Sequence, residues 1–339
     1  MRLGVAVVGA GFIGELHARV VAESPLAQLM AIVDVDKDAA ERVAFKFGVP
    51  WLTSVDSLCE MRDVTAAVVA VPDTAHEEPA SRLLQAGKAV LLEKPMAHTL
   101  DAARRIAEVA RSSQSRLMVG HILRFDPRYV GAAAEVAEGR IGLPVHVTAS
   151  RFTFRHVGER MAGRSSPCFY LGIHDIDAMQ WVTGRRITRV FARSVRSVVA
   201  NSSLPPTDDA IFATCELDGG VAGSLQFGWT LPNHSPSGIS ARLEVVGKLG
   251  YVEVDTHDHG LRVVANTGLS LPDGLHWPET NQRIVGDLAE EVNHFLRSVC
   301  EDKEFLVPVA DAVCNVAVND AIIRSIRSNA FEIVDSLAS

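Results

Sequence analysis

The chain has 339 residues, of which 47% are hydrophobic and 22% charged, and its formal net charge is -8. This length allows more than one hydrophobic core, so we expect two domains. The negative charge argues against a nucleic-acid-binding surface, and no run approaches the ~20 apolar residues of a membrane span. The five cysteines are scattered and form no C-x-x-C pair, which predicts reduced thiols in a cytoplasmic protein.

The first residues predict a dinucleotide-binding motif. An apolar run at 3–8 leads directly into G-A-G-F-I-G, and a helical pattern follows. In this strand–turn–helix context the first glycine makes the tight turn, the second admits a pyrophosphate, and the third lets the helix pack against the strand. The helix N-terminus offers N–H donors and a partial positive charge to the phosphates. The predicted cofactor contacts in this motif are Gly9, Gly11, Phe12, Ile13 and Gly14.

An acidic residue ends the second apolar run. Residues 29–33 lead into Asp34, at the distance where dinucleotide domains hold the adenosine ribose hydroxyls with a carboxylate. A capping or turn aspartate before the helix that starts near Asp38 is the alternative. Because a carboxylate repels a 2′-phosphate and Val35 supplies no arginine, we predict NAD in preference to NADP, with Lys37 weakening that preference.

Strand and helix patterns alternate as far as residue 120. Predicted strands and helices follow one another at 66–71, 78–85, 89–92, 99–111 and 117–119. Thr99 is the expected cap of the last of these helices. Such alternation predicts a doubly wound parallel sheet with helices on both faces, which is a Rossmann domain over residues 1–121.

After residue 121 the sequence changes to strands joined by Gly, Asp, Asn and Pro turns. They are predicted at 145–154, 189–199, 210–217, 221–229, 241–246 and 250–254. The D-G-G turn at 218–220 predicts a hairpin, and directly joined strands predict an α+β domain over residues 122–339 with a large, mostly antiparallel open sheet. A helix near 174–182 would cover one face. The other face would be buried in a homodimer or homotetramer, and helices at about 286–328 would pack back on the first domain.

A charged triplet follows the strand at 89–92. Its residues are Glu93, Lys94 and Pro95, so a lysine stands at the carboxyl end of a predicted parallel strand, where open α/β sheets bind their ligands. Lys94 is therefore a candidate reactive group, with a surface lysine as the alternative.

The chain resembles a known family. The motifs that carry the resemblance are the glycine motif, V-P-D-T-A-H at 71–76, E-K-P at 93–95 and G-I-H-D-I-D at 172–177. Together they are similar, over essentially the whole chain, to the glucose-fructose oxidoreductase/inositol dehydrogenase/rhizopine catabolism (Gfo/Idh/MocA) family. The resemblance implies a Rossmann domain, an open-sheet substrate domain, bound NAD or NADP, and hydride exchange with a hydroxyl carbon of a sugar, cyclitol or nucleotide sugar. It also implies cofactor contacts by Val71, Pro72, His76, Glu93, Lys94 and His121.

The implied reaction needs particular side chains. Oxidation of a secondary alcohol requires a base near the hydroxyl and a positive group for the developing alkoxide. His174 is the candidate base, because an imidazole titrates near neutral pH, and Lys94 is the candidate electrostatic clamp and proton relay. A histidine that packs at a domain seam is the alternative. Arg124 matches a segment that lines the interdomain cleft in relatives, so it is predicted to bind substrate, with an interdomain salt bridge as the alternative.

The sequence departs from the family pattern at one position. Relatives typically carry an aspartate four residues before the histidine, whereas this chain has Tyr170. Residues with this spacing share a helix face, so a neutral phenol is predicted to contact substrate there. Asp175 is also predicted to contact substrate, and it or Asp177 would compensate for the missing carboxylate.

Two other functions stay open at this point. One is an NAD-dependent glycosidase that oxidises its sugar transiently, and the other is a cofactor-binding regulator without turnover. Lys94 and His174 argue against the regulator. The H-D-H triplet at 257–259 resembles a metal motif but lacks a third ligand group at helical spacing, so we predict no metal site.

Overall fold

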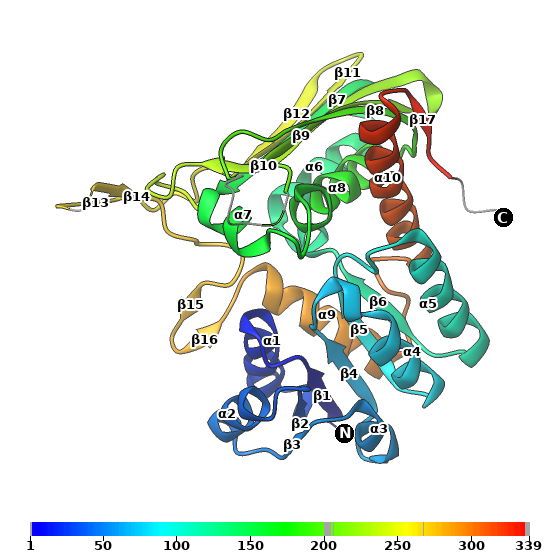
Figure 1. Ribbon diagram of the computed structural model, residues 1–339, viewed down its shortest axis with the longest axis vertical. Helices are drawn as coiled ribbons and strands as arrows, with labels where there is room; N and C mark the ends of the chain where they lie inside the picture. Colours follow the sequence, from blue (N-terminus) through cyan, green and yellow to red (C-terminus); the bar gives the residue numbers. More distant parts are fainter. Residues whose placement is uncertain (1, 200–204, 206, 267, 336–339) are drawn as a thin grey trace. The chain divides into compact units, whose positions relative to one another are not determined.

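The computed structural model describes residues 2–199, 205, 207–266 and 268–335. The chain divides into two compact units (Figure 1). The first contains Met1–Phe125 and Leu275–Val316, and the second contains Asp126–Gly274 and Ala317–Ser339.

The first unit is built on a six-stranded parallel sheet with the order β3-β2-β1-β4-β5-β6. Its strands are β1 (Leu3–Val8), β2 (Ala27–Val33), β3 (Trp51–Leu52), β4 (Ala66–Val69), β5 (Ala89–Glu93) and β6 (Leu117–Gly120). The central strands are runs of buried Val, Ile, Leu and Ala, as expected for a parallel sheet covered on both faces. The predicted doubly wound sheet is confirmed.

Helices connect these strands. They are α1 (Phe12–Glu23), α2 (Lys37–Phe47), α3 (Val55–Glu60), α4 (Glu77–Gln85) and α5 (Leu100–Ser113), with short 3-10 turns η1 (Asp73–Ala75) and η2 (Ile122–Phe125). Two more helices, α9 (Asp287–Glu301) and α10 (Val309–Ser328), come later in the chain. The division between the units falls within α10, whose first residues belong to the first unit and whose later residues belong to the second. The Thr99 hydroxyl caps α5 by accepting a hydrogen bond from the Ala102 N–H at 3.2 Å, as predicted.

The second unit is built on a seven-stranded sheet with the order β12-β11-β7-β10-β9-β8-β17. Its strands are β7 (Pro144–Phe154), β8 (Ile187–Val195), β9 (Ala210–Leu217), β10 (Val221–Leu231), β11 (Ile239–Gly247), β12 (Tyr251–Asp255) and β17 (Glu332–Ile333). Neighbours are antiparallel except β7 and β10, which are parallel. A long connection separates these two strands in sequence, which permits parallel pairing. The predicted hairpin turn η4 (Asp218–Gly220) joins β9 to β10.

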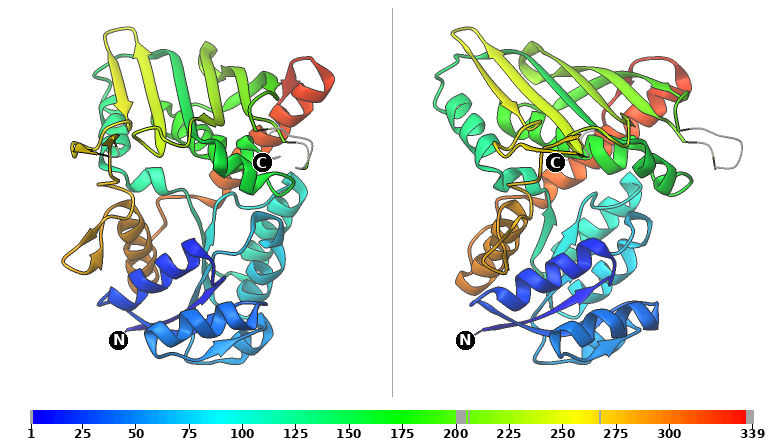
Figure 2. Two further views of the ribbon diagram at one scale, coloured as in Figure 1. Left: turned by 60° about the vertical axis from the view of Figure 1, so that its left-hand side comes forward. Right: turned by 90° about the vertical axis from the view of Figure 1, so that its left-hand side faces the viewer.

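One face of this sheet is covered by helices α6 (Pro127–Ala137), α7 (Arg155–Met161) and α8 (Ile173–Thr183) (Figure 2). Residues of β9 alternate accordingly, because Ile211, Ala213 and Cys215 are buried whereas Phe212 is exposed on the outward face. Two small hairpins complete the described elements: β13 (Val263–Ala265) with β14 (Gly268–Ser270), and β15 (Glu279–Thr280) with β16 (Arg283–Ile284).

Two further properties bear on the environment of the protein. Within the described ranges, no helix combines the length and the apolar character that crossing a bilayer would need. All five cysteines are free thiols.

Candidate functional site

The glycine loop after β1 is shaped by close backbone contacts. Gly9 has a φ of +106°, and a Cβ added there would lie 2.4 Å from the Ala70 carbonyl oxygen in the loop after β4. A Cβ on Gly14 would lie 1.9 Å from the Gly9 carbonyl oxygen. A Cβ on Gly11, however, would meet no protein atom within 4 Å. The fold therefore requires glycine at two of the three positions, and the third leaves room for a ligand such as a pyrophosphate.

The same loop ends at a helix N-terminus without a side-chain cap. Gly11 is the N-cap of α1, and no side chain accepts a hydrogen bond there. The helix starts at Phe12 and Ile13, whose N–H groups belong to the first turn and have no partner within the helix. These donors and the helix dipole suit an anion. The residues present therefore fit the pyrophosphate of a dinucleotide.

Asp34 follows β2 and is held by two backbone N–H groups. Its Oδ2 accepts a hydrogen bond from Ala10 at 2.7 Å, and its Oδ1 accepts one from Asp36 at 2.9 Å. The cap of α2 is Asp36, whose side chain accepts from Asp38 and Ala39. Asp34 is therefore not the capping residue, and its carboxylate is tied to the glycine loop.

A buried acidic cluster surrounds the end of β5. The Oε1 of Glu93 lies 2.8 Å from the Nε2 of His17, a fully buried residue of α1, and its Oε2 accepts a hydrogen bond from the Lys94 N–H at 3.1 Å. Glu291 of α9 brings a third group, since ligand atoms of these three side chains lie within 4.8 Å of one another. Its side chain is buried, and its Oε2 has no hydrogen-bond partner among the described residues.

The two carboxyl groups of this cluster differ in protonation. Burial alone would raise the pKa of Glu93, but the hydrogen bond and charge of His17, with Lys94 nearby, hold it below its usual range. Burial first, and then the charge of Glu93, raise the pKa of Glu291 well above its usual range. The site therefore favours the ionised form of Glu93 and the protonated form of Glu291. Environments that separate the pKa values of neighbouring acids in this way are common at functional sites.

His76 connects the loops that follow β4 and β5. Its Nδ1 lies 2.8 Å from the Pro95 carbonyl oxygen and its Nε2 lies 3.0 Å from the Val71 carbonyl oxygen. Pro72 precedes the short turn η1 between them. Burial lowers the pKa of His76, so the ring is neutral and donates to one of the two carbonyls. The imidazole thus fixes the backbone on which Lys94 is carried.

His121 and Arg124 lie just after β6 and are both buried. The His121 Nε2 is 3.3 Å from the Asn315 Nδ2, and Arg124 donates to the Leu306 carbonyl at 3.0 Å and to Asp311 at 2.8 Å. The Arg124 guanidinium therefore joins η2 to the start of α10 within the first unit, and its predicted contact with substrate stays a prediction.

In the second unit, Tyr170 and His174 lie on one continuous helical segment. Tyr170 belongs to a π-helical turn, η3 (Cys168–Gly172), and His174 is in the first turn of α8. Such turns occur frequently at functional sites. A Cβ on Gly172 would lie 2.7 Å from the Phe227 ring, so glycine lets this segment pack closely on β10. Tyr170 and His174 are both partly exposed.

Asp175 is held by a buried arginine. Arg151 of β7 donates from Nε and Nη2 to the two carboxylate oxygens of Asp175, each at 3.0 Å, and its Nη2 is 3.4 Å from the Tyr129 hydroxyl. Both partners of the ion pair are at most 3% exposed. This bidentate pair fixes α8 on the sheet, and the substrate contact of Asp175 stays a prediction. Asp177 is buried as well.

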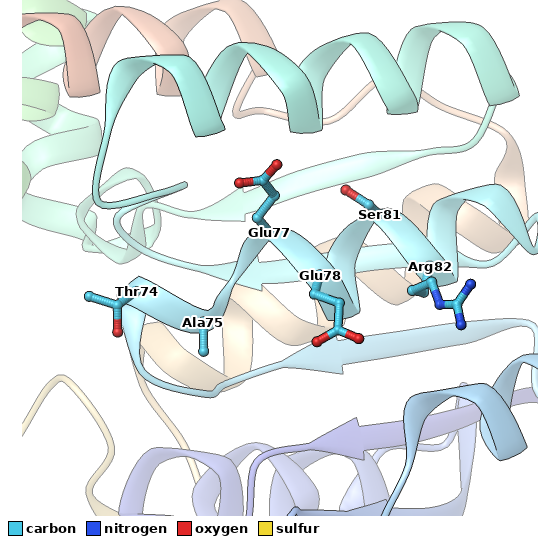
Figure 3. Close-up of a pocket in the computed structure, with 6 residues that line it drawn as sticks. All are labelled: Thr74, Ala75, Glu77, Glu78, Ser81 and Arg82. Carbon is cyan, nitrogen blue, oxygen red and sulfur yellow. The ribbon is translucent and has the colours of Figure 1, made fainter.

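A separate surface pocket lies along α4 (Figure 3). It is lined by Thr74, Ala75, Glu77, Glu78, Ser81 and Arg82. None of the glycine-loop residues, Asp34 or Lys94 lines it, so it is not the dinucleotide site that the loop after β1 forms.

Comparisons with known proteins agree with this geometry. A model described as an oxidoreductase family with an NAD-binding Rossmann fold matches residues 3–121, and a model of the GFO/IDH/MocA C-terminal domain matches residues 129–253. An inositol 2-dehydrogenase from Streptomyces avermitilis is 33% identical over 75% of this chain and 73% of its own length. A scyllo-inositol 2-dehydrogenase (NAD(+)) from Bacillus subtilis is 27% identical over 95% of this chain and 94% of its own length.

Solved structures with similar folds cover nearly the whole chain. GenD2 from gentamicin A biosynthesis, solved in complex with NAD, has a TM-score of 0.85 and 26% identity, covering 99% of this chain and 97% of its own. The scyllo-inositol dehydrogenase from Lactobacillus casei with bound NAD(H) and scyllo-inositol has a TM-score of 0.83 and 19% identity, covering 98% of this chain and 99% of its own. At 19% identity, the similarity to the Lactobacillus casei enzyme is evidence for a shared fold only.

Proposed function

Because the chain belongs to the Gfo/Idh/MocA family of NAD(P)-dependent oxidoreductases, we propose that it oxidises a secondary hydroxyl of a cyclitol or sugar, or reduces the matching ketone, with NAD. The observation that carries this proposal is the end of β5, where Lys94 follows Glu93, which is held by the buried His17, at the same edge of the sheet as the glycine loop. Relatives named inositol 2-dehydrogenase support the substrate class.

The preference for NAD rests on Asp34. A carboxylate held by the Ala10 and Asp36 N–H groups accepts hydrogen bonds from ribose hydroxyls and repels a 2′-phosphate. Two cations of the following helix are already paired, since Arg42 and Lys46 contact Glu15 at 3.2 and 2.6 Å, and the Lys37 ammonium lies 5.3 Å from the centre of the Trp51 ring. They therefore offer little to a phosphate.

Titration with NADH and NADPH, followed by fluorescence, tests this preference. We expect the native protein to bind NADH more tightly than NADPH. Asp34→Asn should reduce the difference in affinity between the two cofactors. Asp38→Asn is the matched control, because Asp38 is an exposed residue of the following helix and its substitution should leave the ratio unchanged. Equal or tighter binding of NADPH by the native protein would refute the preference.

We propose that Lys94 and His174 carry out the proton chemistry. When bound, the nicotinamide accepts the hydride from the carbinol carbon or returns it to the ketone. His174 takes the hydroxyl proton as general base, and the Lys94 ammonium stabilises the developing alkoxide. Glu93, fixed by His17, holds the Lys94 backbone through its Oε2. Tyr170 positions the substrate.

Single substitutions separate these roles. Removal of a general acid or base typically lowers the rate about 10²–10⁴-fold, so Lys94→Ala and His174→Ala should nearly abolish turnover while NADH still binds. Loss of one neutral hydrogen bond costs about 0.5–1.5 kcal/mol, so Tyr170→Phe should lower kcat/KM roughly tenfold at most. If Tyr170→Phe is as damaging as His174→Ala, the phenol takes part in proton transfer and the assignment is wrong.

We further propose that the outward face of the second sheet forms a homodimer or homotetramer in the cytoplasm. Phe212 and Tyr251 on this face are 44% and 65% exposed, and apolar exposure of this kind favours association. A reducing compartment fits the five free thiols. Light scattering should give a mass above that of one chain, and Phe212→Glu should shift it toward the monomer; a monomer mass for the native protein would refute the proposal.

A further inference from the structure

A group of arginines without ion pairs lies on and just after α7 in the second unit, and one of them contacts Tyr170. The arginine patch consists of Arg155, Arg160 and Arg164, all on or just after α7, and the segment 155–164 contains one carboxylate, Glu159. None of the three arginines forms an ion pair among the described residues. Three arginines and one glutamate give this segment a net charge of +2, in a chain whose net charge is -8.

Elsewhere in the second unit most arginines are neutralised. The ion pairs among the described residues include Arg128 with Asp126, Arg140 with Glu138, Arg151 with Asp175, Arg185 with Asp218, Arg189 with Glu216, Arg196 with Asp208, Arg242 with Glu253, Arg262 with Asp258 and Arg324 with Asp320. The arginine patch therefore brings together three positive charges without an ion pair, in a unit where most other arginines have an acidic partner.

Packing brings the patch to Tyr170. A Cβ on Gly158 would lie 2.3 Å from the Trp229 ring, so glycine allows α7 to lie directly on this buried indole. The Tyr170 ring is 6.3 Å from the same indole. Two residues after Gly158, Arg160 is thereby placed so that its Nη2 donates to the Tyr170 hydroxyl at 3.3 Å.

The contact leaves the arginine able to bind more. A guanidinium has five N–H donors, and Arg160 uses one of them on a neutral phenol, so its charge is not satisfied by the protein. Guanidinium groups bind carboxylates and phosphates through two parallel hydrogen bonds. The phenol is four residues before His174, the proposed base, on the same helical segment.

We infer that the substrate carries an anionic group, a carboxylate or a phosphate, and that Arg160 binds it beside Tyr170. This inference rests on the proposed function, because it names the class of polyol that the same site accepts. Sugar acids and phosphorylated sugars or cyclitols satisfy the requirement, whereas unsubstituted inositols and amino-substituted sugars do not.

Matched pairs of compounds test the inference. D-glucuronate is compared with D-glucose, and myo-inositol monophosphate with myo-inositol, by NADH formation with the full-length protein. The native protein should have the higher kcat/KM for the anionic member of at least one pair. The pair that shows the effect distinguishes a carboxylate from a phosphate.

Substitution of the arginine provides the second arm. Arg160→Gln should lower kcat/KM for the anionic compound, relative to kcat/KM for the neutral compound, roughly tenfold to hundredfold, the usual effect of losing a charged hydrogen bond, mainly by raising KM. Arg327→Gln is the matched control, because Arg327 is an exposed arginine of the same unit that also lacks an ion pair. Its kinetics should be those of the native protein. Circular dichroism confirms that both variants are folded.

The remaining outcomes decide between the two proposals. Equal or better turnover of the neutral compounds, or an equal loss on both types in Arg160→Gln, would overturn the inference and leave the dehydrogenase function standing. Calorimetry reports binding without turnover. If the anions bind through Arg160 but no compound is oxidised or its ketone reduced, the proposed function fails while the anion site stands; if neither anion binds, the inference is overturned.

Discussion

Replacement of Glu291 by glutamine is expected to stabilise the protein at neutral and alkaline pH. The Glu291 carboxyl is 1% exposed, and its pKa lies well above the ordinary value of 4.5 because of burial and the neighbouring charge of Glu93. A group whose pKa is raised by folding contributes most to stability below its unfolded pKa, and this contribution is lost as the pH rises toward the folded pKa. Stability should therefore decline above about pH 4.5 on account of this residue.

The expected gain in the free energy of unfolding follows from the difference between the ordinary pKa of glutamate, 4.5, and the pH of the measurement. Each pH unit over which folding holds a proton that the unfolded chain would release costs about 1.4 kcal/mol. From 4.5 to neutral pH the sum is about 3 kcal/mol, an upper limit for a group that stays fully protonated. Glutamine has the shape and the donor of the protonated acid at every pH and avoids this cost.

Urea unfolding followed by tryptophan fluorescence at about pH 5 and about pH 8 measures the difference. Glu291→Gln should match the native protein at the lower pH and exceed it at the higher one. Glu290→Gln is the control, because Glu290 is the exposed neighbour in the same helix. A variant that is less stable than the native protein at the higher pH would show that Glu291 is ionised and paired, and the reasoning would be refuted.

Other substitutions have expected outcomes that follow from single contacts. Gly11→Ala should have the melting temperature of the native protein but bind NADH weakly in a fluorescence titration. Gly14→Ala, whose Cβ would lie 1.9 Å from a carbonyl oxygen, should have a lower melting temperature. Equal melting temperatures for the two variants would contradict this expectation. Asp175→Asn leaves the Arg151 charge buried without its partner, so the free energy of unfolding should fall by about 3–5 kcal/mol, and a loss below about 1 kcal/mol would disprove the buried pair's importance. Burial lowers the pKa of His76 below 6.5, so stability should fall as the pH drops beneath that value, and His76→Gln should remove this part of the pH dependence in denaturant titrations.

The fold was predictable where local rules decide it. The glycine motif, the alternation of strand and helix up to residue 120, and the D-G-G turn all depend on near neighbours in the sequence, and the structure confirms the elements they predict. The parallel pairing of β7 with β10 was not predictable in the same way. It joins strands far apart in the chain, so no local pattern records it.

The site was only partly accessible from the sequence. The spacing from the glycine motif favours Asp34 as the ribose-binding residue. The sequence pattern of the following helix does not show whether Asp34 or Asp36 is its N-cap, and the structure shows that it is Asp36. The pairing of Asp175 with Arg151 joins a helix to a strand 24 residues away and has no sequence signal. Glu291 did have a sequence signal, because it lies between Leu288 and Phe295 on the buried face of α9. Carboxylates are rarely buried in such a position unless they are paired.

In the second unit, the position of α7 and the position of the helix that carries His174 depend on different contacts. Gly158 sets the depth of α7 on the indole, while the helix that bears His174 is anchored independently through Arg151. Exposed positions of α7 such as Arg160 can therefore be exchanged without moving the proposed base. If Arg160 binds the substrate as inferred above, we expect substitutions on α7 to change the substrate preference while the Arg151–Asp175 pair keeps the helix of His174 in place.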